Sequence, residues 1–91
     1  LGDYGLTLAP ADAVGAGDSG AVITDLDPNG RATERGLRQG DIILQAGGQT
    51  VEGPRDVSKA NSGAEKAGKK AILLRVKSGD SVRFLALPLG K

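Results

Sequence analysis

The sequence contains no histidine, cysteine, methionine or tryptophan, and its only aromatic residues are Tyr4 and Phe84. Without cysteine the chain cannot form a disulfide, and without cysteine or histidine it lacks the side chains that bind most zinc and copper ions. Without histidine it also lacks the base that most often activates a serine nucleophile. We therefore expect no metal site, no cofactor and no catalytic residue in this chain.

One short stretch suggests the opposite, because residues 17–20 read GDSG, the run that surrounds the nucleophile of trypsin-like serine proteases. Ser19 would need a base, and no lysine of the chain lies in the apolar run that a lysine base requires. A chain of 91 residues is also too short for the two barrels between which such a site lies. Gly, Asp and Ser are typical turn residues, so we interpret GDSG as a turn before the apolar residues Ala21, Val22 and Ile23.

The charges nearly cancel, with 12 basic and 11 acidic residues spread along the chain. Nucleic-acid binding requires a basic stripe, often with aromatic stacking platforms, so we expect no nucleic-acid partner. The basic group Lys66, Lys69 and Lys70 fits the last turn of a helix, where cations interact favourably with the helix dipole. No apolar run approaches the roughly 18–20 residues of a membrane span, so we also expect no membrane insertion.

The length predicts a single domain over residues 1–91, since domains usually have about 50–250 residues. The chain opens on Leu1 and contains no methionine, so we expect it to be a piece of a longer protein.

Periodicity and turn residues predict a small α+β fold of five to six strands with one short and one long helix. Gly47 and Gly48 have the composition of a two-residue hairpin turn in which both residues have a positive φ. Pro54 marks the start of the long helix, which we expect to continue through the weak helix former Gly63. The predicted strands are residues 4–9, 20–26, 41–46, 49–51, 71–77 and 81–87, and the predicted helices are residues 31–35 and 54–67. These elements favour a curled antiparallel sheet or partly open barrel that the helices seal.

Residues 36–44 read GLRQGDIIL and are followed by Gly47 and Gly48. In physical terms Gly36 ends the short helix, Leu37 enters the core, and Asp41 satisfies nearby backbone donors as a central strand begins. This stretch resembles the GL-x-x-GD-x-I-L-x-x-x-G pattern of PDZ domains.

Two further stretches support the resemblance. The tripeptide Tyr4-Gly5-Leu6 is similar to the carboxylate-binding loop of PDZ domains, and residues 69–89 resemble the end of a second PDZ domain in bacterial HtrA/Deg (Do-like) periplasmic serine proteases. In that group the strand order is circularly shifted, which puts the binding loop near the start of the domain, as here. The resemblance implies a periplasmic location and a trypsin-like protease as the parent protein.

The resemblance also implies the function, which is capture of an extended, C-terminal hydrophobic peptide as an added strand. The peptide would lie between residues 6–9 and the helix 54–67, and the amides near Gly5 would receive its carboxylate. The partners implied are peptides of unfolded or client proteins and the other domains of the parent protease. The residues implied to bind the peptide are Tyr4, Gly5, Leu6, Thr7, Leu8, Val57, Asn61 and Ala64.

The same positions also predict specificity. Many PDZ domains have histidine where Val57 lies, and histidine can bond a Ser or Thr two residues before the end of the ligand. Valine cannot form this hydrogen bond, so we expect the ligand to have an apolar residue two positions before its end. The small side chains of Asn61 and Ala64 leave room for a bulky apolar terminal residue.

Several alternatives remain open. The tripeptide around Gly5 is also compatible with an ordinary strand start, and Val57 and Ala64 with core positions. The domain could instead serve the assembly of the protease with little peptide binding. Its parent could also be a secretion-system or intramembrane-protease protein.

Overall fold

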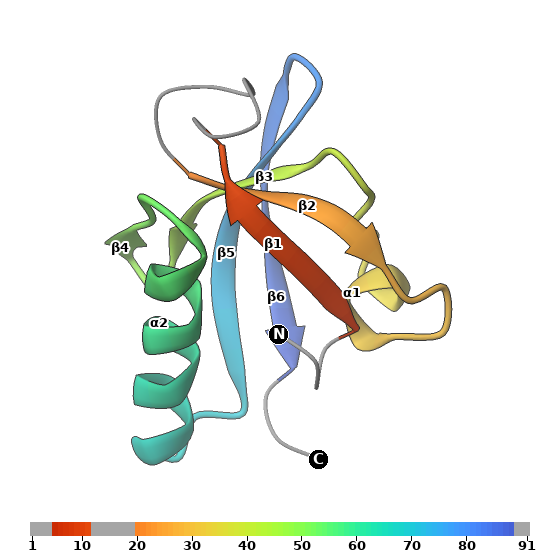
Figure 1. Ribbon diagram of the computed structural model, residues 1–91. Helices are drawn as coiled ribbons and strands as arrows, with labels where there is room; N and C mark the ends of the chain where they lie inside the picture. The colour runs from red at the N-terminus through yellow and green to blue at the C-terminus, as the bar shows by residue number, and fades with distance from the viewer. Residues whose placement is uncertain (1–4, 12–19, 89–91) are drawn as a thin grey trace.

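The computed structural model describes residues 5–11 and 20–88. The described residues form six strands and two helices, which agrees with the predicted α+β class. The elements are β1 (Leu6–Pro10), β2 (Ala21–Leu26), α1 (Arg31–Glu34), β3 (Ile42–Ala46), β4 (Gln49–Thr50), α2 (Pro54–Lys66), β5 (Ala71–Ser78) and β6 (Ser81–Pro88). Figure 1 shows their arrangement.

The strands belong to one antiparallel sheet in the order β1-β2-β3-β5-β6, with the short β4 paired to β3. The sheet curls but does not close, so β1 and β6 form its two edges. Helix α2 contacts β1, β2, β3 and β5 and runs in the direction opposite to β1 (Figure 1). The partly open sheet predicted from the sequence is therefore confirmed.

Local sequence signals account for most element boundaries. Gly47 and Gly48 have φ values of 60° and 83°, as the hairpin turn between β3 and β4 requires. Gly36 has φ 92° directly after α1, where it acts as a left-handed helix terminator. Helix α2 has Pro54 in its first turn and continues through Gly63, as predicted, because Val57 on the same helix is anchored in the core.

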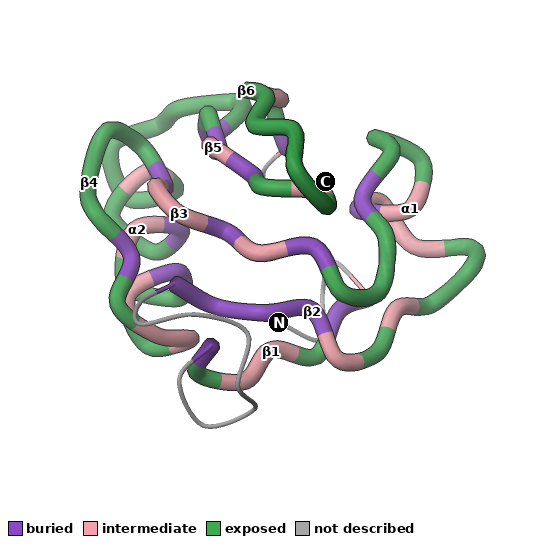
Figure 2. The backbone as a smooth tube through the Cα atoms, turned by 90° about the horizontal axis from the view of Figure 1, so that it is seen from above, coloured by how far each residue is buried: buried purple, intermediate pink, exposed green. Residues whose placement is uncertain are grey.

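The core lies between the inner face of the sheet and α2, as the buried segments in Figure 2 show. Strand β5 illustrates how it is built, since its residues alternate between the core and the outer face. Leu37 is 2% exposed and belongs to this core, as predicted. The buried cluster consists of Leu6, Ala21, Ile23, Ala32, Leu37, Ile43, Ala46, Val51, Val57, Ile72, Leu74, Val76 and Leu87.

The first strand differs slightly from its prediction, because it spans Leu6–Pro10 rather than residues 4–9. A proline is tolerated there because β1 is an edge strand and one side of it carries no neighbouring strand of the described sheet. Ala11 then donates its N–H to the carbonyl of Gly20 at 3.1 Å. Ser19 and the rest of residues 12–19 lie outside the described residues. In the described part of the chain, neither helix is long and apolar enough to cross a membrane.

Candidate functional site

The start of β1 depends on Gly5, which has φ 71°. Its carbonyl accepts a hydrogen bond from the N–H of Asp27 at 2.7 Å, so the start of β1 is tied to the turn that follows β2. A Cβ atom at Gly5 would lie 2.9 Å from Cβ of Asp27 and 3.1 Å from Cα of Gly30. Glycine is therefore required here by the packing of the fold, independently of any ligand.

Within the described residues β1 pairs with β2 alone, so one side of this strand has no neighbouring strand there. Thr24 forms a bulge in β2, and its hydroxyl donates to the carbonyl of Thr7 at 3.3 Å. The Thr7 main chain thus faces β2. Because main-chain groups of successive residues in a strand point to opposite sides, those of Leu8 point to the open edge.

Three of the predicted site residues lie on one face of α2. Val57 has no exposed surface and belongs to the core cluster, and Ala64 is half-buried against that cluster. Asn61 lies between them and is 2% exposed. On β1, Leu8 is also half-buried against the core. The structure therefore brings Leu8 and this face of α2 to one side of the core, and we call Gly5, Thr7, Leu8, Val57, Asn61 and Ala64 the β1–α2 site.

Two predicted residues stand apart from this group. Tyr4 lies outside the described residues. Leu6 is 4% exposed and belongs to the core, where it anchors β1 to the rest of the sheet. Contact of a peptide with any of the predicted site residues, including the buried Val57 and Asn61, stays a prediction.

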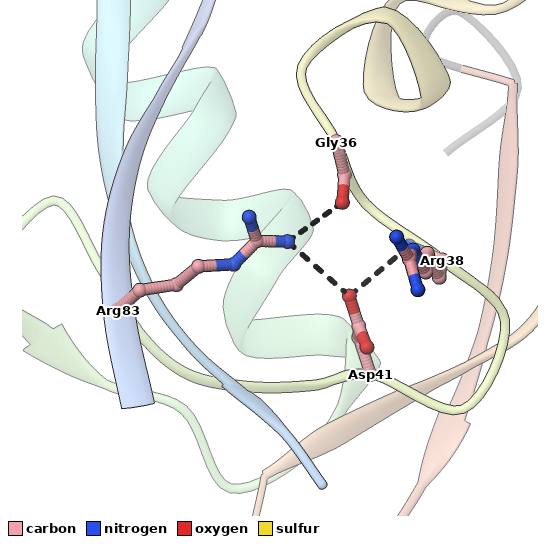
Figure 3. Close-up of polar contacts among 4 residues, drawn as sticks. All are labelled: Gly36, Arg38, Asp41 and Arg83. Atoms are coloured by element: carbon pink, nitrogen blue, oxygen red, sulfur yellow. Dashed lines mark hydrogen bonds and ion pairs between the residues drawn. The ribbon is translucent and has the colours of Figure 1, made fainter. Parts of the chain in front are cut away.

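A polar cluster of Gly36, Arg38, Asp41 and Arg83 connects β6 to the segment after α1 (Figure 3). The Arg83 guanidinium donates to the carbonyl of Gly36 at 2.6 Å, and its Nη2 lies 3.8 Å from Oδ2 of Asp41. The same Asp41 oxygen accepts the N–H of Arg38 at 3.0 Å. The predicted role of Asp41 as an acceptor for backbone donors is confirmed, whereas the part of Arg83 was not foreseen, because no local pattern links residues so far apart in the sequence.

The sequence analysis also missed an apolar surface. Leu73, Val82 and Phe84 are 52%, 45% and 61% exposed, and all three point away from the core on β5 and β6. We call these three residues the β5–β6 outer face. Strand alternation in residues 71–77 and 81–87 was the signal that could have identified it.

No group of three or more His, Cys, Asp or Glu side chains that could hold a metal ion occurs among the described residues. The site consists instead of main-chain groups at a sheet edge, apolar side chains and one carboxamide. Such an arrangement is suited to binding an extended chain rather than to catalysis.

Comparison with known proteins agrees with this geometry. The PDZ domain family model matches residues 1–80. A DegP-like periplasmic serine endoprotease of Brucella suis is 44% identical over 91 residues, which are the whole of this chain and 17% of that protein. A do/HhoA-like periplasmic serine protease of Haemophilus influenzae is 36% identical over 81 residues, which cover 89% of this chain and 16% of that protein. This chain thus spans about a sixth of the length of these relatives, whose names agree with the periplasmic location that was expected.

Solved structures are similar in fold. The HtrA3 PDZ domain bound to a phage-derived ligand has a TM-score of 0.76 at 19% identity, covering 93% of this chain and 81% of that chain. The HtrA-type protease AlgW with a decapeptide has a TM-score of 0.70 at 25% identity, covering 96% of this chain and 28% of that chain. The family match, the relatives and the open edge strand beside a helix lead to one conclusion: the chain belongs to the PDZ domain family, and its relatives are proteases of the HtrA/DegP type.

Proposed function

We propose that this PDZ domain binds the carboxyl-terminal end of an extended, apolar peptide, which adds as a strand to β1 and lies beside α2. The observation that carries the proposal is the open edge of β1, where the main-chain groups of Leu8 point away from β2. Main-chain pairing supplies the affinity in this mode of recognition, and the neighbouring side chains supply the specificity.

The carboxylate of the peptide is proposed to bind at the start of β1, around Tyr4, Gly5 and Leu6. The positive φ of Gly5 bends the chain as the strand begins, a geometry in which backbone N–H groups can converge on an anion. Val57, Asn61 and Ala64 on α2 are proposed to contact the side chains of the ligand. The solved structures of the HtrA3 domain and of AlgW, both similar in fold, contain a phage-derived ligand and a decapeptide respectively.

In the longer protein, this domain is proposed to recognise substrates or to regulate a linked serine protease, as the names of its relatives suggest. Its ligands would be apolar chain ends of unfolded or client proteins in the periplasm. Short peptides lose much of their binding free energy to ordering, so we expect a Kd of roughly micromolar or weaker.

The test is a titration of the ¹⁵N-labelled domain with a decapeptide that has apolar residues at its last and third-last positions. We expect amide shifts in residues 5–9 and 57–64, and at least about tenfold weaker binding when the carboxylate is replaced by an amide. Equal binding of the acid and amide forms, or shifts that avoid both segments, would contradict the proposal.

A second candidate function is assembly of the parent protease, and the β5–β6 outer face favours it. Arg75 and Lys77 lie directly opposite Phe84 and Val82 in the sheet register, so the face is apolar and basic. Two copies of the same face would repel each other, and the partner is therefore proposed to be a different surface. A hollow of about 520 Å³ adjoins Leu73 and is lined mainly by Gly and Ala residues of the β3–β4 turn and α2, Ala64 among them.

Phe84→Ser in the full-length protein distinguishes the two functions. If the outer face mediates assembly, this variant lowers the oligomeric mass measured by light scattering and leaves peptide binding intact. An unchanged mass would exclude the assembly role of this face.

A further inference from the structure

The side chain of Asn61 is polar and buried, yet its polar atoms form no hydrogen bond in the described structure. Among the described residues, the buried polar side chains belong to Asp41 and Asn61, which are 5% and 2% exposed. Asp41 accepts the N–H of Arg38, whereas neither Nδ2 nor Oδ1 of Asn61 has a hydrogen-bond partner in the described structure. A buried amide without partners is unfavourable for the free domain, and an apolar side chain of the same shape would be more favourable there. The folded domain by itself therefore does not explain this residue.

The position of Asn61 suggests what its partner is, on the basis of the proposed function. Asn61 follows Val57 by four residues, which corresponds to about 6 Å along the helix axis. Alternate residues of a bound strand are about 6.6 Å apart and point to the same side. A peptide whose third-last side chain lies beside Val57 therefore presents its last side chain beside Asn61.

The direction of the chain agrees with this assignment. Helix α2 runs opposite to β1 (Figure 1), so a peptide strand that pairs antiparallel with β1 runs in the same direction as α2. A peptide carboxylate bound near Gly5 places the last residue towards Asn61 and Ala64, and earlier residues towards Val57.

We propose that Asn61 is a specificity-determining residue that selects a hydroxyl group on the last side chain of the ligand. A carboxamide offers both a donor and an acceptor, which a hydroxyl can complement in either direction. Because no hydrogen bond holds the carboxamide in the free domain, it can rotate towards the ligand without losing an interaction. The half-buried Leu8 and Ala64 contact the apolar part of the same ligand residue.

Charged terminal side chains fit this position less well than a hydroxyl. An acidic side chain would lie beside the peptide carboxylate, and a basic one would have to be buried without a carboxylate partner. Thr has a hydroxyl where Val has a methyl group, and Tyr adds a hydroxyl to the ring of Phe, so the members of each pair have a similar shape and differ in one hydroxyl. These two pairs therefore measure the contribution of Asn61 most directly.

The experiment measures the Kd of four peptides that differ only in the last residue (Thr, Val, Tyr or Phe), with the wild-type domain and with Asn61→Leu. Leucine has the branching of asparagine but no polar atoms. We expect the wild type to favour the hydroxyl peptide of at least one pair by roughly 3–10-fold. We expect Asn61→Leu to reverse that preference and to unfold at a denaturant midpoint no lower than that of the wild type.

Two further variants serve as controls. Asn29→Leu makes the same chemical change in an exposed turn and is expected to leave the peptide ratios unchanged. Asn61→Ala removes the carboxamide without adding volume, and is used in the same way if the leucine variant does not fold. If the Kd ratios Thr/Val and Tyr/Phe are each the same in the wild type and in the Asn61 variants, the inference alone is overturned. Absence of binding of every free-carboxylate peptide to the wild type overturns the proposed function as well.

Discussion

The two edge strands of the sheet, β1 and β6, are built differently. Strand β1 has five residues, pairs with β2 through a bulge, and lies beside α2 with one main-chain side open. Strand β6 has eight residues and pairs with β5 without interruption. Its Arg83 side chain bonds to the segment after α1, and its apolar side chains Val82 and Phe84 are exposed on the outer face.

Because of this difference, we expect the two edges of the sheet to interact differently with other molecules. An inward-pointing charged residue such as Arg83 makes an edge strand less suitable for pairing with another strand. Strand β1 carries no charged residue and keeps its edge open. We therefore expect β1 to bind through its main chain, and the β6 side to bind through the faces of its side chains.

The largest effect is expected at the anchor of β1. Leu6→Ala should lower the free energy of unfolding by about 2–5 kcal/mol, because Leu6 is 4% exposed in the core and its truncation leaves a cavity. Urea unfolding followed by circular dichroism measures the change. A loss below about 1 kcal/mol would mean that β1 is not anchored as described.

Gly5→Ala should lower the free energy of unfolding by about 1–3 kcal/mol, since the residue has φ 71° and the new Cβ meets Asp27. Peptide binding should weaken at the same time, because the strain lies where β1 begins. Gly79→Ala is the matched control, as Gly79 also has a positive φ but its Cβ would have nothing within 4 Å. An equal loss in both variants would show that φ alone, and not the contact with Asp27, is responsible.

Asp41→Ala should cost about 1–3 kcal/mol of stability, because it leaves the Arg38 N–H without its acceptor and removes the ion-pair partner of Arg83. Arg83→Ala should cost less, at most about 1.5 kcal/mol, because Arg83 is 44% exposed and solvent screens its ion pair. Thermal unfolding of both variants tests the order. A larger loss of stability for Arg83→Ala than for Asp41→Ala would mean that the hydrogen bond from Arg83 to Gly36 contributes more than the contacts of Asp41.

Phe84→Ser should have the smallest effect on stability, within about 0.5 kcal/mol, because the side chain is 61% exposed. The matched change on the inner face is Leu87→Ser, three residues later on the same strand, where the side chain is 1% exposed and a large loss is expected. Urea unfolding of the two variants compares how much the outer and inner faces of β6 contribute to the free energy of unfolding. A loss for Phe84→Ser that approached the loss for Leu87→Ser would indicate that the outer face is packed rather than free.

The element boundaries and turns followed from the sequence because they depend on short-range effects. The turn at Gly47 and Gly48, the helix start at Pro54 and the end of α1 at Gly36 are determined by allowed φ and ψ angles. Alternation and helical periodicity then identified which strands and helix faces are apolar. The same patterns, together with the resemblance they supported, led to the correct family.

Only the tertiary structure decided which side chains these faces meet. Whether Asn61 is buried without a partner, whether Phe84 is left uncovered, and whether Arg83 reaches Gly36, 47 residues away in the chain, all depend on how distant segments pack. Local sequence patterns carry no information on such distances, because periodicity defines a face of an element but not the atoms that lie opposite it. The sequence by itself determined the elements and their apolar faces, and packing decided which polar and apolar groups remain available for a partner.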